Sequence, residues 1–274
     1  MRINKELFTK LPKSAQEEFL RALTPVQMAA LKYDWEFNAR PNQLMPEGDH
    51  WDIWLALAGR GFGKTRTGSE FVRKLIRSGY TRIALIGDTA ADVRDTMING
   101  ESGILAVHPK HERPTYSPST RSLKWPNGAI GHCLSAEDPE SIRGLQFMAG
   151  YIDELGKYRY AESVWSNYQF ALRLGVRPLT FVATTPRPIK TLKDIIKNPR
   201  TVITKGSSYD NITNLAPSFA AQLQAYAGTR LGRQEIDGEL LEDSKFALWS
   251  REVFQRVDHV DLGSLSRIVV SVDP

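Results

Sequence analysis

Short apolar runs that alternate with segments of helical periodicity dominate the middle of the chain. The apolar runs are residues 52–59, 81–89, 147–154 and 177–186. Each run is short and ends in glycine or polar residues, which is typical of a buried strand. The segments of helical spacing between them are residues 64–79, 90–98 and 161–175. Strands that alternate with helices predict an α/β fold, with a mostly parallel sheet and crossover helices.

The chain before these runs has a helical pattern of its own. Residues 6–35 are predicted to be helical, with two start signals. Ser14 is a candidate N-cap because Glu17 follows three residues later, as in a capping box. Thr24 stands before Pro25, and proline is favoured at the first position of a helix.

Further segments add smaller elements. Residues 121–136 predict a hairpin that turns at residues 126–128, Pro-Asn-Gly. After Pro188 the chain becomes more polar and helical, and residues 218–243 predict a small helical lobe. The last eight residues, 267–274, begin a new strand.

Polar segments follow three of the predicted strands. They are the glycine-rich loop after residue 57, the acids after residue 152 and the threonines after residue 183. In open parallel sheets, ligands bind at the carboxyl ends of the strands. We therefore expect these three segments to meet at one edge of the sheet.

The composition is ordinary for a globular protein, with 274 residues, 41% hydrophobic and 24% charged. No apolar run is long enough for a membrane span and no signal peptide is visible, so we expect a cytoplasmic protein without membrane contact. The single cysteine, Cys133, excludes an internal disulfide and a cysteine zinc site. The net charge of +5 permits an anionic partner such as DNA without requiring one.

The stretch AGRGFGKT, residues 58–65, predicts a phosphate-binding loop between a strand and a helix. Its glycines let backbone N–H groups turn toward phosphate oxygens at the helix start. Lys64 is expected to reach the β- and γ-phosphates of ATP, and Thr65 to place its hydroxyl on Mg²⁺. The usual pattern has glycine where this chain has Ala58, a residue small enough to keep the turn tight. The predicted nucleotide-binding residues of the loop are Gly59, Arg60, Gly61, Phe62, Gly63, Lys64 and Thr65.

Acids and hydroxyls at the other strand ends supply candidate chemistry. Asp153 is expected to hold Mg²⁺, and Glu154 to orient and deprotonate an attacking water. The second acid favours hydrolysis over transfer of the phosphoryl group to another substrate. Thr184 and Thr185 can hydrogen-bond the γ-phosphate or the water, although a strand-end turn without a function explains them equally well.

Three further side chains are candidates for the same site. Arg60, inside the loop, can stabilise the charge that develops in phosphoryl transfer. Arg143 precedes the acid pair by ten residues and can face a neighbouring subunit. Gln43 stands shortly before the first strand, and an amide can hydrogen-bond adenine as both donor and acceptor. For each of them a structural or surface role is the open alternative.

Several of these blocks occur together in a fixed order. They are residues 35–73, 135–154, 182–188 and 207–243. In this combination the chain resembles the large terminase subunit of tailed bacteriophages, with the type found in prophages and gene transfer agents as the nearest match. The resemblance implies an additional-strand, RecA-like P-loop ATPase with a small helical lid, followed by a nuclease domain of the RNase H type.

The resemblance also implies a function and partners. The family motor hydrolyses ATP with Mg²⁺ and moves double-stranded DNA into a procapsid. Its partners are the portal protein, the small terminase subunit and further copies of itself, usually in a ring of five. The family has a phosphate-loop arginine, matched by Arg60, a strand-end coupling motif, matched by Thr184 and Thr185, and an adenine-reading glutamine, matched by Gln43. Some members also have an arginine that acts on a neighbour, matched by Arg143.

By this resemblance the chain divides into four parts. Residues 1–38 form an N-terminal helical segment, 39–204 the ATPase core and 205–245 the lid. Residues 246–274 are expected to be a linker and the first nuclease strand, which ends in Asp273 as a metal-binding acid. The other acids of such a nuclease are missing from the sequence, so we expect no DNA cleavage by this chain.

Two other functions stay open on the sequence. A helicase-like DNA-dependent ATPase shares these motifs, but helicases usually carry a second motor lobe, and only about 120 residues follow Glu154. A non-hydrolysing DNA- or portal-binding module would have a decayed site, yet every expected catalytic side chain is present.

Overall fold

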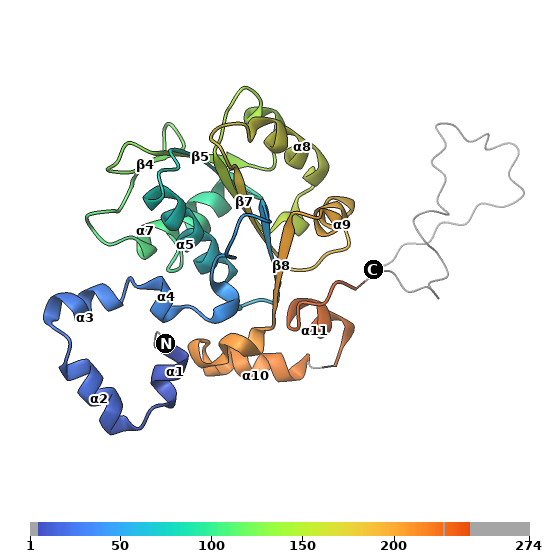
Figure 1. The fold of residues 1–274 in the computed structure, drawn as a ribbon. Helices are drawn as coiled ribbons and strands as arrows, with labels where there is room; N and C mark the ends of the chain where they lie inside the picture. Colours follow the sequence, from blue (N-terminus) through green and yellow to red (C-terminus); the bar gives the residue numbers. More distant parts are fainter. Residues whose placement is uncertain (1–4, 227, 242–274) are drawn as a thin grey trace, which may run out of the picture. The chain divides into compact units, whose positions relative to one another are not determined.

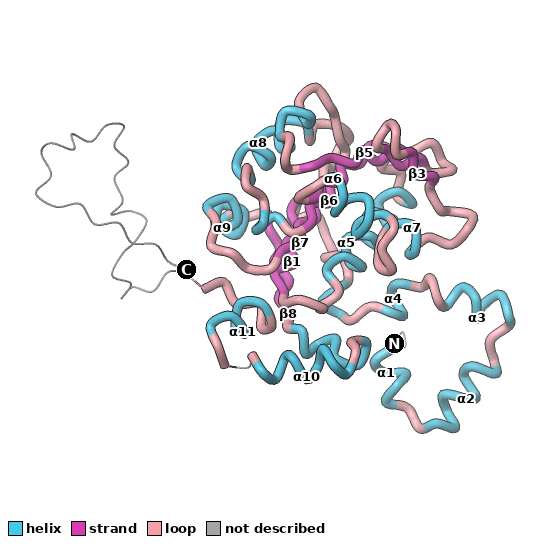
Figure 2. The backbone as a smooth tube through the Cα atoms, turned by 180° about the vertical axis from the view of Figure 1, so that it is seen from behind, coloured by secondary structure: helices cyan, strands magenta, loops and turns pink. Residues whose placement is uncertain are grey.

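A computed structural model describes residues 5–226 and 228–241 of the chain. These residues contain an eight-stranded sheet in the order β3-β4-β5-β2-β6-β7-β1-β8 (Figure 2). The strands are β1 (Ile53–Ala58), β2 (Arg82–Gly87), β3 (Thr115–Ser117), β4 (Ser122–Lys124), β5 (Ile130–Ser135), β6 (Ala149–Asp153), β7 (Leu179–Thr184) and β8 (Thr201–Gly206). The strand predicted at residues 267–274 and its Asp273 lie outside the described residues.

Six neighbouring strands of the sheet, from β5 to β8 in the sheet order, pair in parallel. β4 and β3 extend the sheet at the β5 side as antiparallel strands, which confirms the predicted hairpin. β7 lies between β1, which precedes the glycine-rich loop, and β6, which ends in the acid pair. The mostly parallel α/β fold with an additional strand is therefore confirmed.

Helices cover both faces of the sheet, with α5 and α7 on one face and α8 and α9 on the other (Figure 1). The α-helices are α1 (Lys5–Lys10), α2 (Lys13–Arg21), α3 (Pro25–Leu31), α4 (Trp35–Asn38), α5 (Lys64–Arg77), α6 (Ala90–Asp92), α7 (Ile104–Val107), α8 (Ala161–Ala171), α9 (Lys190–Lys197), α10 (Pro217–Ala225) and α11 (Arg230–Glu235). The remaining turns are 3-10 helices η1 (Pro41–Gln43), η3 (Pro139–Ile142), η4 (Leu155–Lys157) and η5 (Ser208–Asn214), and the π-helix η2 (Val93–Ile98). No helix of the described residues is long and apolar enough to cross a lipid bilayer.

Each face of the sheet has its own hydrophobic core. Under α5, the rings of Trp54 and Phe71 pack on Phe181, with centroids 4.8 and 5.6 Å away. On the other face Leu55 belongs to a cluster that includes Val164 of α8. Neighbouring residues of one strand serve both cores because successive side chains point to opposite faces. This burial on both sides explains why the central strands are continuous apolar runs.

The N-terminal segment is helical as predicted, but it is divided into α1, α2, α3 and the start of α4. The Thr24 cap is confirmed, because its side chain accepts from the Gln27 amide at the start of α3. The Ser14 cap is wrong. α2 begins two residues earlier than predicted, after Pro12, which places Ser14 inside the first turn of the helix.

β8 is a strand that the sequence analysis missed, since residues after Pro188 were predicted to be polar and helical. It pairs with β1 along its whole length, from Thr201 opposite Ile53 to Gly206 opposite Ala58. Its side chains are mostly half-buried because it forms an edge of the sheet. An edge strand lacks the continuous apolar pattern of a central strand, and its partner is about 150 residues earlier in the chain.

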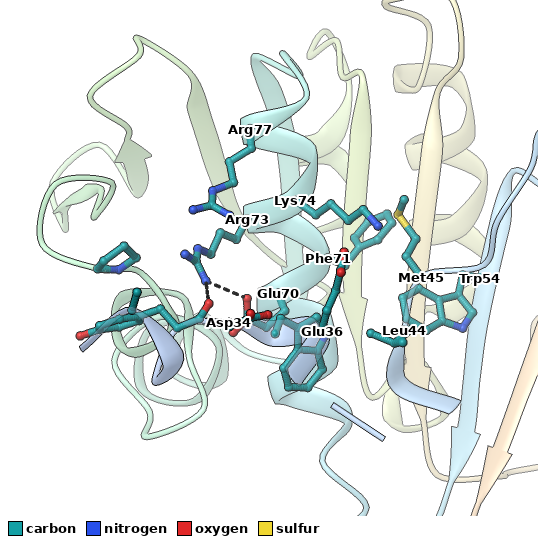
Figure 3. A pocket seen from close by; sticks show the side chains of 14 residues that line it. Asp34, Glu36, Leu44, Met45, Trp54, Glu70, Phe71, Arg73, Lys74 and Arg77 are labelled. Atoms are coloured by element: carbon teal, nitrogen blue, oxygen red, sulfur yellow. Dashed lines mark hydrogen bonds and ion pairs between the residues drawn. The ribbon is translucent and has the colours of Figure 1, made fainter. Parts of the chain in front are cut away.

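The segment before the sheet is anchored on the outer surface of α5. Arg73 donates to the Tyr33 carbonyl at 2.8 Å and pairs with Glu70 at 3.3 Å. The Arg66 guanidinium lies over the Trp35 ring, 5.5 Å from its centroid. A cavity of about 480 Å³ opens between this segment and α5 (Figure 3). It borders α5 from Glu70 onward, beyond the first turn of the helix, and is therefore separate from the glycine-rich loop.

Candidate functional site

The glycine-rich loop connects β1 to α5 at the carboxyl edge of the sheet. Gly61 has φ 74° and Gly63 has φ 99°, so both adopt the left-handed conformation that favours glycine. Lys64 is the first residue of α5, and Gly63 is its N-cap. The backbone therefore turns into a helix start, the arrangement that favours a bound anion.

Gly59 sits where two chain segments almost touch. A Cβ atom at this position would lie 2.1 Å from the Ile236 carbonyl oxygen. The Gly59 amide donates to Gly206 at 3.0 Å, and the Arg60 amide donates to the Glu235 carbonyl at 2.7 Å. The glycine-rich loop is thus hydrogen-bonded directly to the end of α11, a helix that follows the last strand in the chain.

Lys64 is buried, and its ammonium group points into the loop. Its Nζ donates to the carbonyls of Ala58 at 2.9 Å and Gly59 at 3.2 Å. The same Nζ lies 3.4 Å from Glu154 Oε1 and 3.3 Å from Thr185 Oγ1. One cation therefore joins the loop, the acid pair of β6 and the end of β7, as the sequence predicts for one edge of the sheet.

Glu154 directly follows β6 and has a left-handed backbone, with φ 53°. This conformation is costly for a residue with a side chain, and such residues are concentrated at functional sites. Glu154 Oε2 accepts from the Thr185 amide at 3.2 Å. Burial opposes its ionisation, but the Lys64 ammonium and the Thr185 amide favour the carboxylate, and together they hold the pKa of Glu154 below its usual value. At neutral pH this side chain is ready to accept a hydrogen bond from water.

Asp153 is the buried member of the acid pair, with 8% of its surface exposed. Its Oδ1 accepts from the Tyr151 hydroxyl at 2.9 Å, and its carbonyl accepts from the Tyr158 hydroxyl at 2.8 Å. Burial, and secondarily the charge of Glu154, raise the pKa of Asp153 to about 6. A cation beside this carboxylate would offset the cost of its burial.

We expect Asp153→Asn to stabilise the nucleotide-free protein at pH 8 by up to about 3 kcal/mol, from a pKa shift of roughly two units. The folded protein holds this proton more tightly than the unfolded chain, whose aspartate has a pKa near 3.8. Stability of the wild type therefore falls as pH rises from about 4 to 6. Thermal unfolding of both proteins at pH 4 to 8 should show a difference in stability that grows between pH 4 and 6. A difference that does not change with pH would contradict the raised pKa of Asp153.

Thr184 and Thr185 are both buried at the end of β7. Thr184 Oγ1 accepts from the Gly156 amide at 2.9 Å and donates to the Thr185 carbonyl at 2.8 Å. Thr185 contacts Glu154 and Lys64. The two threonines therefore connect the end of β7 to the turn that carries Glu154.

Arg60 points away from the loop toward α11. Its Nε donates to Glu235 Oε2 at 2.5 Å, and 61% of its side chain is exposed. Arg60, Glu235 and Glu154 line one small cavity of about 120 Å³. Arg60 is therefore next to Glu154 of the acid pair, but its guanidinium is paired with Glu235.

The same cavity is lined by two cations that the sequence analysis did not single out, Lys157 and Arg187. Lys157 follows Glu154 by three residues and Arg187 follows Thr185 by two, so their proximity to the motifs was the available signal. Glu235 had no such signal, because it lies 175 residues after Arg60.

Gln43 is buried beside the glycine-rich loop. Its Nε2 donates to Thr67 Oγ1 at 3.1 Å, and its Oε1 accepts from the Arg40 amide at 3.3 Å. A Cβ atom on Gly63 would lie 2.8 Å from Gln43 Nε2. Gln43 is therefore at the predicted place, although its amide is engaged within the protein.

A cavity of about 680 Å³ adjoins this corner of the site. Arg40 and Asn42 line it from one side, and Tyr209 and Asp210 from the other. The Arg40 guanidinium also donates to the Phe62 carbonyl and to Asn211, the latter at 2.8 Å. The cavity is therefore large enough for a planar ring system and has polar walls.

Arg143 lies apart from these residues. It pairs with Glu140 at 2.8 Å and donates to Asn167 of α8 at 3.4 Å, and 67% of its side chain is exposed. In the described part of the chain it joins neither the loop nor the acid pair. Asp273, the expected nuclease acid, lies outside the described residues.

The described residues hold no cluster of three or more His, Cys, Asp or Glu side chains suited to a metal ion. Mg²⁺ in nucleotide sites is usually bound by one or two protein ligands together with phosphate oxygens and water. Thr65 and Asp153 fit this smaller donor set, since Thr65 has a hydroxyl in the first turn of α5 and Asp153 a buried carboxylate at the end of β6.

The fold is similar to solved structures of phage large terminases. The ATPase domain of the Thermus phage P74-26 large terminase matches with a TM-score of 0.57 and 14% identity, over 77% of this chain and 97% of that chain. The large terminase of the thermophilic bacteriophage D6E matches with 0.59 and 14%, over 77% and 52%. That of bacteriophage HK97 matches with 0.52 and 17%, over 79% and 50%. The chain thus spans about half the length of the D6E and HK97 proteins, and at these identities the likeness shows the fold alone.

A comparison with curated proteins found no match. The family model described as terminase large subunit, T4likevirus-type, N-terminal, matches residues 55–256. This range covers most of β1, the glycine-rich loop, the acid pair, the end of β7 and α11. Because the match extends over most of the chain, the protein belongs to the family of terminase large subunits and carries its N-terminal part.

Proposed function

We propose that this protein is an ATP-hydrolysing motor that moves double-stranded DNA into a viral procapsid. The observation that carries the proposal is the convergence of Lys64, Glu154 and Thr185, with Lys64 Nζ 3.4 Å from Glu154 and the Thr185 amide 3.2 Å from it. Family membership supports the packaging role. Structures of the D6E large terminase in complex with ADP and with ATP-γ-S support a nucleotide as ligand.

Lys64 and the loop amides bind the phosphates in this proposal. In the structure the ammonium is hydrogen-bonded to the carbonyls of Ala58 and Gly59. An anionic phosphate is a stronger partner for a buried cation than neutral carbonyls are. Lys64 would therefore turn to the β- and γ-phosphates when ATP enters the loop.

Thr65 and Asp153 would hold Mg²⁺ in the same site. The ion, when bound, supplies positive charge beside the phosphate oxygens and offsets the charge that develops there. The buried carboxylate of Asp153 must be ionised for this role. Its pKa of about 6 means that metal binding should weaken as pH falls below that value.

Glu154 would act as the general base of hydrolysis. Its carboxylate accepts a proton from water while the water oxygen bonds to the γ-phosphorus and the bond from that phosphorus to the bridging oxygen breaks. The Thr185 amide fixes Oε2, while Oε1 lies beside the Lys64 ammonium and the Thr185 hydroxyl. Oε1 would face the water once Lys64 turns to the phosphates. Thr184 joins the same strand end to the Gly156 amide, which gives a path by which phosphate loss can move the turn.

Arg60 would stabilise the transition state after leaving Glu235. Arg60 and Glu154 line one cavity, so the guanidinium would reach the site by a rotation of its side chain. Release of Glu235 would free the lid, for which we propose the predicted bounds of residues 205–245. Hydrolysis and lid movement would thereby be coupled through a single ion pair.

The cavity beside Gln43 is the proposed place for the adenine ring. Its walls offer Arg40, Asn42 and Tyr209, which suit the polar edges and the face of a base. Gln43 would exchange its bond to Thr67 for a bond to the base.

The partners and domains of the proposed motor follow the family resemblance. They are the portal protein, the small terminase subunit and a ring of further copies, in the cytoplasm of a bacterial host. We keep residues 1–38 as the N-terminal segment, 39–204 as the ATPase core and 246–274 as the linker to a nuclease domain.

Phosphate release and DNA movement must be measured separately to test the proposal. ATP-dependent displacement of a third strand from a DNA triplex reports translocation, and it should require hydrolysis, portal and procapsid. Hydrolysis without displacement in the assembled system would reduce the proposal to an ATPase. Displacement of one strand of a plain duplex would instead favour the helicase.

Mixing two inactive variants tests whether Arg143 acts on a neighbour. We expect Arg143→Ala and Glu154→Gln proteins to be inactive alone and to recover part of the ATPase activity when mixed. A neighbour would then supply Arg143 to a site with an intact Glu154. Size measurements must show a mixed oligomer, and no recovery in that oligomer would contradict the role.

A further inference from the structure

Tyr151 is a fully buried tyrosine in the middle of the acid-bearing strand. It lies on β6 two residues before Asp153, so both side chains project from the same face of the sheet. Its ring lies beside that of Phe181 of β7, with centroids 5.5 Å apart. Apolar neighbours of this kind would be served equally well by a phenylalanine, so the hydroxyl group needs a separate explanation.

The hydroxyl contacts one of the two side chains proposed to hold Mg²⁺. It donates to Asp153 Oδ1 at 2.9 Å. A phenol has one proton, so this bond fixes the direction in which the hydroxyl points. Asp153 is thereby oriented through Oδ1, and its other lone pairs are left for a cation.

The helix above the strand makes room for this phenol. A Cβ atom on Gly68 of α5 would lie 2.4 Å from Tyr151 Cζ. Glycine inside a helix costs about 1 kcal/mol relative to alanine. Gly68 therefore carries a local cost and leaves the Tyr151 ring the space that it occupies under the helix.

We propose that Tyr151 is a positioning residue for the Mg²⁺ of the ATP site, and that its hydroxyl holds Asp153 in the orientation that binds the cation. The inference rests on the proposed function, since it concerns the metal of that site. Residues that orient metal ligands typically change metal affinity by about 10- to 100-fold when they are replaced. Tyr151→Phe removes the hydroxyl and keeps the ring.

The test is a Mg²⁺ titration of ATP-γ-S binding to the full chain, followed by calorimetry. For Tyr151→Phe we expect the Mg²⁺ concentration at half-saturation to rise about tenfold. Binding of the nucleotide without metal should be unchanged, which also shows that the variant is folded.

Tyr168→Phe is the matched control. Tyr168 is also fully buried, its hydroxyl is hydrogen-bonded to Thr180 Oγ1 at 2.8 Å, and a Cβ atom on Gly150 would lie 2.3 Å from that hydroxyl. Thr180 is at the opposite end of β7 from the site. The control should lose similar thermal stability without a change in Mg²⁺ affinity.

Two results would overturn the inference while the proposed function stands. One is an equal Mg²⁺ half-saturation in Tyr151→Phe and wild type, and the other is an equal rise in both tyrosine variants. A wild-type protein that binds no nucleotide with or without Mg²⁺ would overturn the proposed function itself, and the inference with it.

Discussion

Replacement of Glu154 by glutamine should lower the maximal rate of ATP hydrolysis by about 10² to 10⁴, the usual contribution of a general base. Glutamine keeps the size of the side chain and can still accept from the Thr185 amide, which lies 3.2 Å from the carboxylate. It cannot take a proton from water. Binding of ATP should therefore persist, and phosphate release should be measured in the assembled complex with DNA present.

A surface acid provides the matched control for this variant. Glu162 of α8 is exposed and pairs with Lys190 at 2.7 Å, away from the phosphate-binding loop. Glu162→Gln should leave the turnover unchanged. If Glu154→Gln hydrolyses ATP as fast as this control, Glu154 is not the general base.

Replacement of Arg60 by alanine should lower turnover by about 10³ or more, the range seen for arginines that stabilise phosphoryl transfer. The affinity for ATP should change much less, because Lys64 and the loop amides bind the ground-state phosphates. Rates must be measured at saturating ATP to separate the two effects. A rise in KM with unchanged kcat would assign Arg60 to ground-state binding instead.

Glu235→Gln separates loss of the ion pair from loss of the guanidinium. Arg60 pairs with Glu235 in the structure, so Arg60→Ala and Glu235→Gln both lose that pair. Glu235→Gln removes the pair but keeps the guanidinium, and it should retain hydrolysis. Equal losses in the two variants would show that the ion pair, and not the transition state, explains the effect of Arg60.

The predicted sheet edge illustrates how local pattern can locate a site. Lys64, Glu154 and Thr185 come from three separate strand ends, and the structure brings them within 3.4 Å of one another. This could be predicted because parallel strands end at one edge whatever the details of packing. Strand order was not needed for the prediction, only the alternation of strands and helices.

Other contacts of the site could not be predicted in this way. The pair of Arg60 and Glu235 joins residues 175 positions apart, and neither has a pattern that names the other. The bond between Tyr151 and Asp153 depends on the space that Gly68 leaves under α5. A tyrosine in an apolar run is equally consistent with simple packing.

By itself, the sequence determined a glycine-rich loop between a strand and a helix, the strand ends and the α/β class, because glycine spacing and hydrophobic periodicity act over a few residues. Only the tertiary structure decided that β8 completes the sheet, that Arg60 is held by Glu235, and that the Tyr151 hydroxyl donates to Asp153. These contacts depend on how distant segments pack, since one strand edge, one cavity or one missing Cβ atom selects the partner.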